Sequence, residues 1–211
     1  DPYRSIRRLA DLGRQFAKGR FQEELFSLFQ RLLLNEDGPY YEMLKQLVSS
    51  VDTDSLKTLG INIGYNSWTC GASRLRQITA EKDYPHWLAE ISLSPERSAS
   101  QLKEQLSAAL KNGTYAFRLH LPAQSITTDT RQLGLIREFP DCSFFLDFMD
   151  TDCTYSDDLL ELTCSCDNLA FLVPFGSLQS RQLVDLLNAR QRIYGVCRTY
   201  DNTNAAERIS D

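Results

Sequence analysis

The sequence lacks several features that would narrow its function at once. No apolar run approaches the length of a membrane span, and no hydrophobic signal-peptide core is visible. It contains no G-x-G-x-x-G, no Walker loop, no G-x-S-x-G elbow and no H-E-x-x-H helix. These absences argue against a dinucleotide-binding, P-loop, α/β-hydrolase or zincin protein, and they predict no membrane partner.

Basic charge is also scarce. The chain has 23 Lys and Arg against 28 Asp and Glu, a net charge of −5. A nucleic-acid-binding protein normally carries a basic stripe that meets phosphates, so we expect no nucleic-acid partner. One basic cluster, within residues 3–21, has the spacing of the solvated face of a helix.

The cysteines do not form a dense, loop-rich disulfide framework. They are scattered through expected strands and helices, at Cys70, Cys142, Cys153, Cys164, Cys166 and Cys197. This distribution predicts reduced thiols in a cytoplasm. Cys153, Cys164 and Cys166 match no common zinc-ligand spacing, and the carboxylates around Asp150 and Asp152 also suit a loop and a helix start. We therefore predict no metal site and assign no cofactor.

The chain divides by pattern into three parts. Residues 1–57 have helical periodicity only, with Pro39 suited to a first helical position and Asp52 or Asp54 suited to a cap. They predict a small helical N-terminal segment. Residues 58–200 alternate between strand and helix patterns, and residues 201–211 form a polar tail.

The alternating part predicts six parallel strands. Their expected ranges are Gly60–Asn66, Trp87–Leu93, Thr114–Leu121, Cys142–Met149, Asn168–Val173 and Ile193–Tyr200. The helices between them are expected at Trp68–Glu81, Ser100–Asn112, Thr128–Phe139, Ser156–Cys164 and Ser180–Arg190. The fold class is therefore α/β.

Four successive expected strands have one apolar and one polar face. The polar set consists of Asn62, Asn66, Glu90, Ser92, Arg118, His120 and Asp147. Because unpaired burial of such groups is costly, they should face one another, water or a ligand. A doubly wound sheet would be apolar on both faces, so the pattern favours a partial (β/α)6 barrel with a polar lumen. The alternative is an antiparallel or half-exposed sheet whose polar face meets solvent.

One known family fits this arrangement. "NSWTCGASRLR" places a cysteine, Cys70, just after the first expected strand, and "SLSPE" ends the second strand at Glu96. This order resembles radical S-adenosylmethionine enzymes of bacterial type, which are similar in being six-fold partial barrels. In that family a CxxxCxxC motif holds a [4Fe–4S] cluster, and a Gly-Gly-Glu-Pro-like segment meets the methionyl amino group. Here the second and third cysteines are missing, so the resemblance implies a relative without cluster chemistry and carries over no catalytic residue.

Three functional hypotheses follow. The first is a small-molecule-binding barrel, accessory or regulatory, whose ligand meets Asn62, Asn66, Ser92, Glu96 and Arg118. The second is a lyase- or hydrolase-type enzyme that uses His120 as base, Asp147 to orient it, and Glu90 paired with Arg118. The third is a protein-interaction module whose N-terminal helices, rich in Phe21, Phe26, Phe29, Tyr40 and Tyr41, dock a protein partner or a second copy of the chain.

Overall fold

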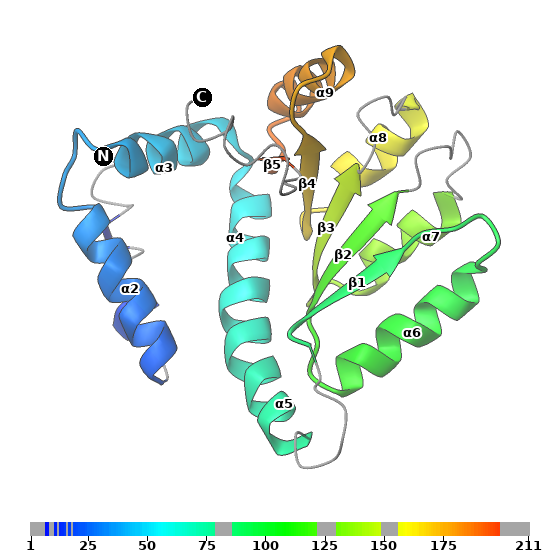
Figure 1. Cartoon of the computed structure of the whole chain (residues 1–211), viewed down its shortest axis with the longest axis horizontal. Helices are drawn as coiled ribbons and strands as arrows, with labels where there is room; N and C mark the ends of the chain where they lie inside the picture. The colour runs from blue at the N-terminus through cyan, green and yellow to red at the C-terminus, as the bar shows by residue number, and fades with distance from the viewer. Residues whose placement is uncertain are drawn as a thin grey trace, which may run out of the picture.

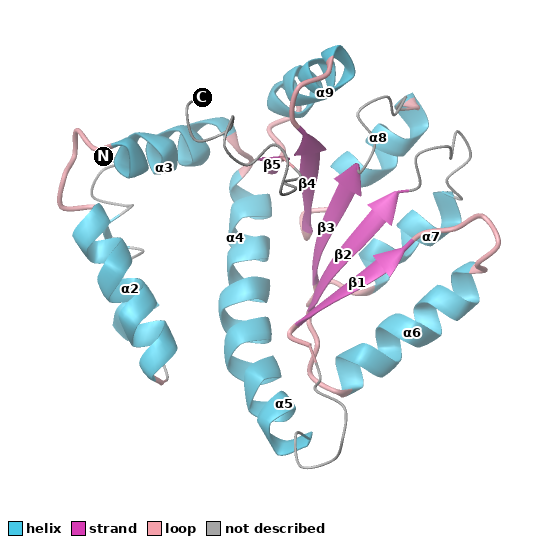
Figure 2. Cartoon of the chain, viewed as in Figure 1, coloured by secondary structure: helices cyan, strands magenta, loops and turns pink. Residues whose placement is uncertain are grey.

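The computed structural model is an α/β fold built on one five-stranded parallel sheet (Figures 1 and 2). It describes residues 7–8, 11, 13–15, 17, 19–78, 86–121, 130–148 and 156–198. The strands lie side by side in chain order: β1 Leu88–Ser92, β2 Ala116–Leu121, β3 Ser143–Phe148, β4 Leu169–Pro174 and β5 Tyr194–Cys197. All neighbouring pairs are parallel, as the alternating pattern predicts.

The connecting helices confirm four of the five predicted inter-strand helices to within a few residues. They are α6 Ala99–Lys111, α7 Thr130–Gly134 with the 3₁₀ turn η2 Leu135–Glu138, α8 Asp157–Cys164 and α9 Leu178–Ala189. Serine side chains cap three of them, because each hydroxyl accepts a hydrogen bond from an early backbone N–H group. Ser98 and Gln101 form a complete capping box at the start of α6.

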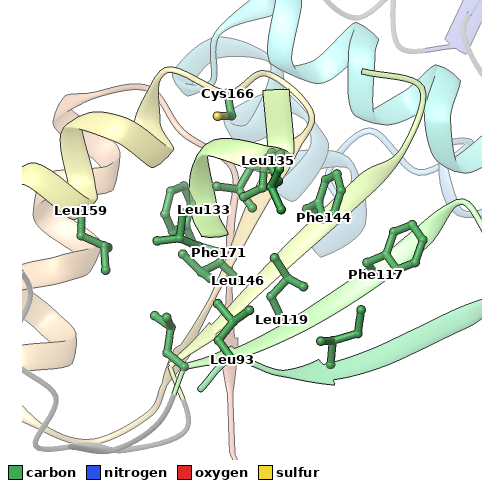
Figure 3. Packing of buried hydrophobic residues seen from close by; sticks show 14 of the residues in the cluster. Leu93, Phe117, Leu119, Leu133, Leu135, Phe144, Leu146, Leu159, Cys166 and Phe171 are labelled. Carbon is green, nitrogen blue, oxygen red and sulfur yellow. The ribbon is translucent and has the colours of Figure 1, made fainter. Parts of the chain in front are cut away.

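These helices cover one face of the sheet and enclose the main core (Figure 3). Leu102 and Leu106 of α6 join Leu183 and Leu187 of α9 in the same buried cluster as the strand residues. The rings of Phe117 on β2 and Phe144 on β3 stack within it, with centroids 5.5 Å apart. The apolar half of the strand alternation therefore forms the core, as expected.

The N-terminal helices also agree with the sequence. They are α2 Arg20–Leu32 and α3 Pro39–Ser50, with Pro39 in the first turn. Tyr41 and Leu33 pack together in a second, much smaller buried cluster. Among the described residues, no helix is long and apolar enough to cross a bilayer.

The prediction of a strand at Gly60–Asn66 is wrong. Helix α4 Thr53–Ile61 continues through the π-helix η1 Asn62–Gly71 into α5 Ala72–Ile78. The sheet consequently has five described strands rather than six, and the boundary expected between residues 57 and 58 falls inside a helix. Asp52 caps α4, as predicted, accepting from the N–H groups of Asp54 and Ser55.

Tertiary contacts account for this difference. The helix buries Ser55, Leu59, Asn62, Ser67 and Gly71, a helical spacing, whereas the alternating Ile61 and Tyr65 remain 58% and 60% exposed. The apolar residues of the alternating pattern thus lie on the exposed side of a helix, and polar and glycine residues form its packed side. Local alternation was overridden by this packing.

The continuous helix formed by α4, η1 and α5 (residues 53–78) is called the long helix below. It lies on the sheet face opposite α6–α9 (Figure 1), along the ends where the strands begin. At its start, the N–H of Asp52 donates to the carbonyl of Gln191, 2.8 Å away, just before β5. The Ser55 hydroxyl donates to Asp167, just before β4, at 3.0 Å, and Arg192 pairs with the same carboxylate. These contacts anchor α4 beneath the last two strands.

Further along, the helix meets the beginnings of β3 and β2. The Asn62 amide donates to the carbonyls of Pro140 and Cys142, at 2.8 and 3.0 Å. Gly71 packs so closely on Gly113 that an added Cβ would stand 2.4 Å from the Gly113 carbonyl oxygen. Gly113 itself has a φ of 98°, which favours glycine. The helix therefore crosses this face of the sheet at the ends where the strands begin.

Candidate functional site

Beyond the long helix, toward the ends of the strands, this face brings four predicted site residues together. Glu90 and Arg118 are register partners on β1 and β2, and His120 and Asp147 are register partners on β2 and β3. In a parallel sheet, residues in register on one face lie side by side. All four therefore form one cluster toward the ends of the strands, where ligand sites of parallel α/β sheets are commonly found.

Asp147 is the centre of the cluster. Its side chain is only 6% exposed, and its Oδ2 accepts hydrogen bonds from Arg118 Nε at 2.8 Å and pairs with Nη2 at 2.6 Å. Glu90 is 58% exposed and meets Arg118 Nη1 at 3.4 Å. The strong, buried pair is therefore Arg118 with Asp147, and Glu90 is a looser, solvated neighbour.

His120 lies between the two carboxylates. Its Nε2 is 3.4 Å from Glu90 Oε2, and its Nδ1 is 3.2 Å from Asp147 Oδ2. The approach of Nδ1 to Asp147 does not have hydrogen-bond geometry, so this buried nitrogen has no hydrogen-bond partner among the described residues. A buried polar atom of this kind is costly unless something bonds to it.

A fifth residue, Cys197, belongs to the same cluster and was missed. The sequence predicts a strand at Cys197 and assigns this residue no role in a site. Burial raises the pKa of its thiol, the Asp147 carboxylate raises that pKa further, and the Arg118 guanidinium opposes both. Only the order of the strands brings Cys197 on β5 near a charge on β3, and no sequence motif signals this.

The same charges act on Arg118. Partial burial alone would lower the pKa of its guanidinium, but the hydrogen bond and charge of Asp147, with Glu90 and Cys197, raise the pKa above its ordinary value. Arg118 is therefore a cation at neutral pH.

Other predicted ligand-binding residues lie elsewhere. Asn62 and Asn66 are on the long helix, and the Asn66 amide donates to Asn62 Oδ1 and to the Asp141 carbonyl, at 2.9 and 3.0 Å. They hold the helix against the start of β3 and do not join the cluster. Ser92 is the register partner of His120 and is exposed beside it. Glu96 is exposed in the turn after β1, where its carboxylate makes no hydrogen bond or ion pair with the described residues.

Several residues considered in the sequence analysis lie outside the described part of the chain or in a different secondary-structure element than expected. Asp150, Asp152 and Cys153 lie outside the described ranges. Within those ranges, no group of three or more His, Cys, Asp and Glu side chains is arranged to hold a metal ion. Cys70 lies inside η1 rather than in a loop after a strand, so the resemblance to radical S-adenosylmethionine enzymes loses that point of similarity.

Together, the fold and the cluster define an α/β protein with a parallel sheet that is apolar under its crossover helices and charged on the open half of its other face. A scan against protein-family models and searches of curated proteins and of solved structures find no match to this chain.

Proposed function

We propose that this protein binds a small polar molecule over the cluster of Glu90, Arg118, His120 and Asp147. The observation that carries the proposal is the buried Nδ1 of His120, which has no partner beside the ion pair of Arg118 and Asp147. A ligand that hydrogen-bonds to this imidazole would remove the cost of leaving it unpaired. The sequential strand order is also that of an opened (β/α) barrel, in which ligands sit at the strand ends.

Arg118 is the group expected to hold a charged part of the ligand. Its Nε and Nη2 are engaged by Asp147, while Nη1 has, among the described residues, only the 3.4 Å contact with the exposed Glu90. A carboxylate or phosphate can replace Glu90 at Nη1 with a shorter, charge-assisted bond. Asp147 meanwhile keeps the guanidinium in place, so the site is ordered before the ligand arrives.

The geometry favours binding over the enzyme hypothesis. A base oriented by a carboxylate would place the imidazole in a well-aligned hydrogen bond with Asp147, as in catalytic triads. Here the strongest bonds of Asp147 go to Arg118, and His120 approaches it without that alignment. The cluster is therefore organised around the arginine, which is a binding group and not a proton carrier.

Native mass spectrometry of protein purified without oxygen tests this function. We expect a small organic adduct on the wild-type chain and on the control Arg181→Ala, whose exposed arginine lies on α9. Arg118→Ala should lose the adduct because the charged anchor is gone. Thermal melting of each variant separates this loss from unfolding.

Two results would contradict the proposal. One is a wild-type protein whose native mass equals that of the polypeptide alone, without an adduct. The other is an Arg118→Ala variant that melts at a lower temperature but keeps the adduct, since Arg118 would then only close an internal ion pair.

A further inference from the structure

A hollow lies away from the charged cluster, between the start of α2 and the long helix. Its volume is about 420 Å³, within the range of small-molecule sites. Both tryptophans of the chain, Trp68 and Trp87, line it together with Arg20 and Arg76. It therefore combines aromatic surface with two positive charges.

One wall of this cavity holds a buried hydroxyl without a partner. Ser67 is 1% exposed and lines the cavity, and its Oγ makes no hydrogen bond with the described residues. A helical serine commonly bonds back to a carbonyl one turn earlier, which this one does not do. An unpaired buried hydroxyl is destabilising unless a bound group completes it.

The start of α2, a helix of 13 residues, also lines the cavity through Gly19, Arg20 and Gln22. Its N-cap is Gly19, with a φ of 97° and no side chain to accept from the first N–H groups. Such a helix start attracts anions through its N–H groups and its dipole. Gly19 also lines the cavity, so this end of the helix is directed at the same space as Ser67.

The charges favour an anionic ligand. Arg20 bonds to Glu24 through Nε at 2.7 Å, which leaves its terminal nitrogens for another acceptor. Arg76 is exposed and forms no ion pair within the described part of the chain. A phosphate at this place would meet two guanidinium groups, the α2 start and the Ser67 hydroxyl, all of them donors that phosphate accepts.

We propose that this cavity binds an aromatic phosphate, with its ring against the tryptophans and its phosphate between Arg20, Arg76 and the start of α2. Indole rings stack on planar aromatic groups, and a stacked base is worth about 1–3 kcal/mol in nucleic-acid binding. The ring and the phosphate are thus recognised by different side chains of the lining. This site is independent of the charged cluster on the sheet.

Intrinsic fluorescence is a direct test because both tryptophans line the cavity. Adenosine 5′-monophosphate and phenyl phosphate are titrated into the full chain, with adenosine and inorganic phosphate as the separate halves of the ligand. We expect a saturable change in emission with the two aromatic phosphates and much weaker binding of either half.

Three variants sharpen the result. Arg76→Gln should weaken binding by about tenfold or more, the effect of losing one charged hydrogen-bonding group. Ser67→Ala should weaken it several-fold. Arg74→Gln, an exposed arginine on the same helix that does not line the cavity, is the matched control and should bind like the wild type. Circular dichroism verifies that each variant is folded.

The proposal is overturned if neither aromatic phosphate gives a saturable change with the wild-type chain. It is also overturned if Arg76→Gln binds as tightly as Arg74→Gln, or if inorganic phosphate binds as tightly as the aromatic phosphates. In native mass spectra, an adduct that is lost with Arg76→Gln and kept with Arg118→Ala assigns that adduct to this cavity and not to the sheet cluster.

Discussion

The two faces of the sheet are built from the same strands but differ in the elements that cover them and in the side chains that they carry. On one face, four crossover helices enclose leucine and phenylalanine side chains in one buried apolar cluster. On the other face, a single long helix covers one end and ionised groups occupy the other. The comparison teaches that a parallel sheet can be stabilised from one side while its second side is left for a site.

The second face is itself divided by side-chain size. Near the starts of β2 and β3, this face presents the small buried residues Ala116 and Ser143, which are register partners. Two residues further along β2 and β3, the same face carries Arg118 and Phe145 as register partners. This change in side-chain size separates the part of the face near the long helix from the charged cluster.

The largest expected effect compares Phe144 with its neighbour Phe145, which point to opposite faces. Phe144 is fully buried and stacks on Phe117, whereas Phe145 is half-buried on the charged face. Phe144→Ala should lower the free energy of unfolding by about 3–5 kcal/mol, and Phe145→Ala by roughly a third of that, because only the first leaves a closed cavity. Urea unfolding of both variants measures the difference. Equal losses would mean that the two faces are buried alike.

Smaller effects are expected for two glycines of the long helix, whose replacement by alanine should change stability in opposite directions. A Cβ on Gly71 would collide with the Gly113 carbonyl, so Gly71→Ala should destabilise the protein by about 1–3 kcal/mol and loosen the helix from the sheet. A Cβ on Gly60 would meet nothing within 4 Å, so Gly60→Ala should stabilise it by about 0.5–1 kcal/mol. Urea midpoints of the two variants should move in opposite directions. A destabilised Gly60→Ala would argue against a helix at that position.

The smallest effect concerns reactivity and leaves stability aside. Since the thiolate is the reactive form, the raised pKa of Cys197 should make its alkylation by iodoacetamide slow at neutral pH and faster only at higher pH than for an ordinary thiol. Asp147→Asn should move the pH profile of this rate down, and Arg118→Gln should move it up, because the two charges act oppositely on the thiol.

Peptide mapping by mass spectrometry follows each cysteine separately. Cys142 serves as an internal control, because burial raises the pKa of its thiol to about 12 and it should stay unmodified in the folded chain. A Cys197 profile that both substitutions move in the same direction would show that these charges do not face the thiol.

The sequence by itself determined the α/β class, five of the strands, their crossover helices and the apolar face. The reason is that these features depend on local periodicity and caps, such as the alternation in β2 and the Ser98–Gln101 box of α6. It also indicated the residues of the charged cluster, because alternation assigns Glu90, Arg118 and Asp147 to one face, and parallel register then aligns them. That they bind a ligand stays a prediction.

Only the tertiary structure decided the rest. Residues 59–66 alternate like a strand, yet the amide of Asn62 finds its carbonyl partners before β3 only from a helix, and those partners are about 80 residues away in the chain. Cys197 near Asp147, and Trp87 near Trp68, likewise depend on which segments meet in space. Periodicity reports which side of an element is buried, but it does not report what that side packs against, and here the packing determined both the element and its neighbours.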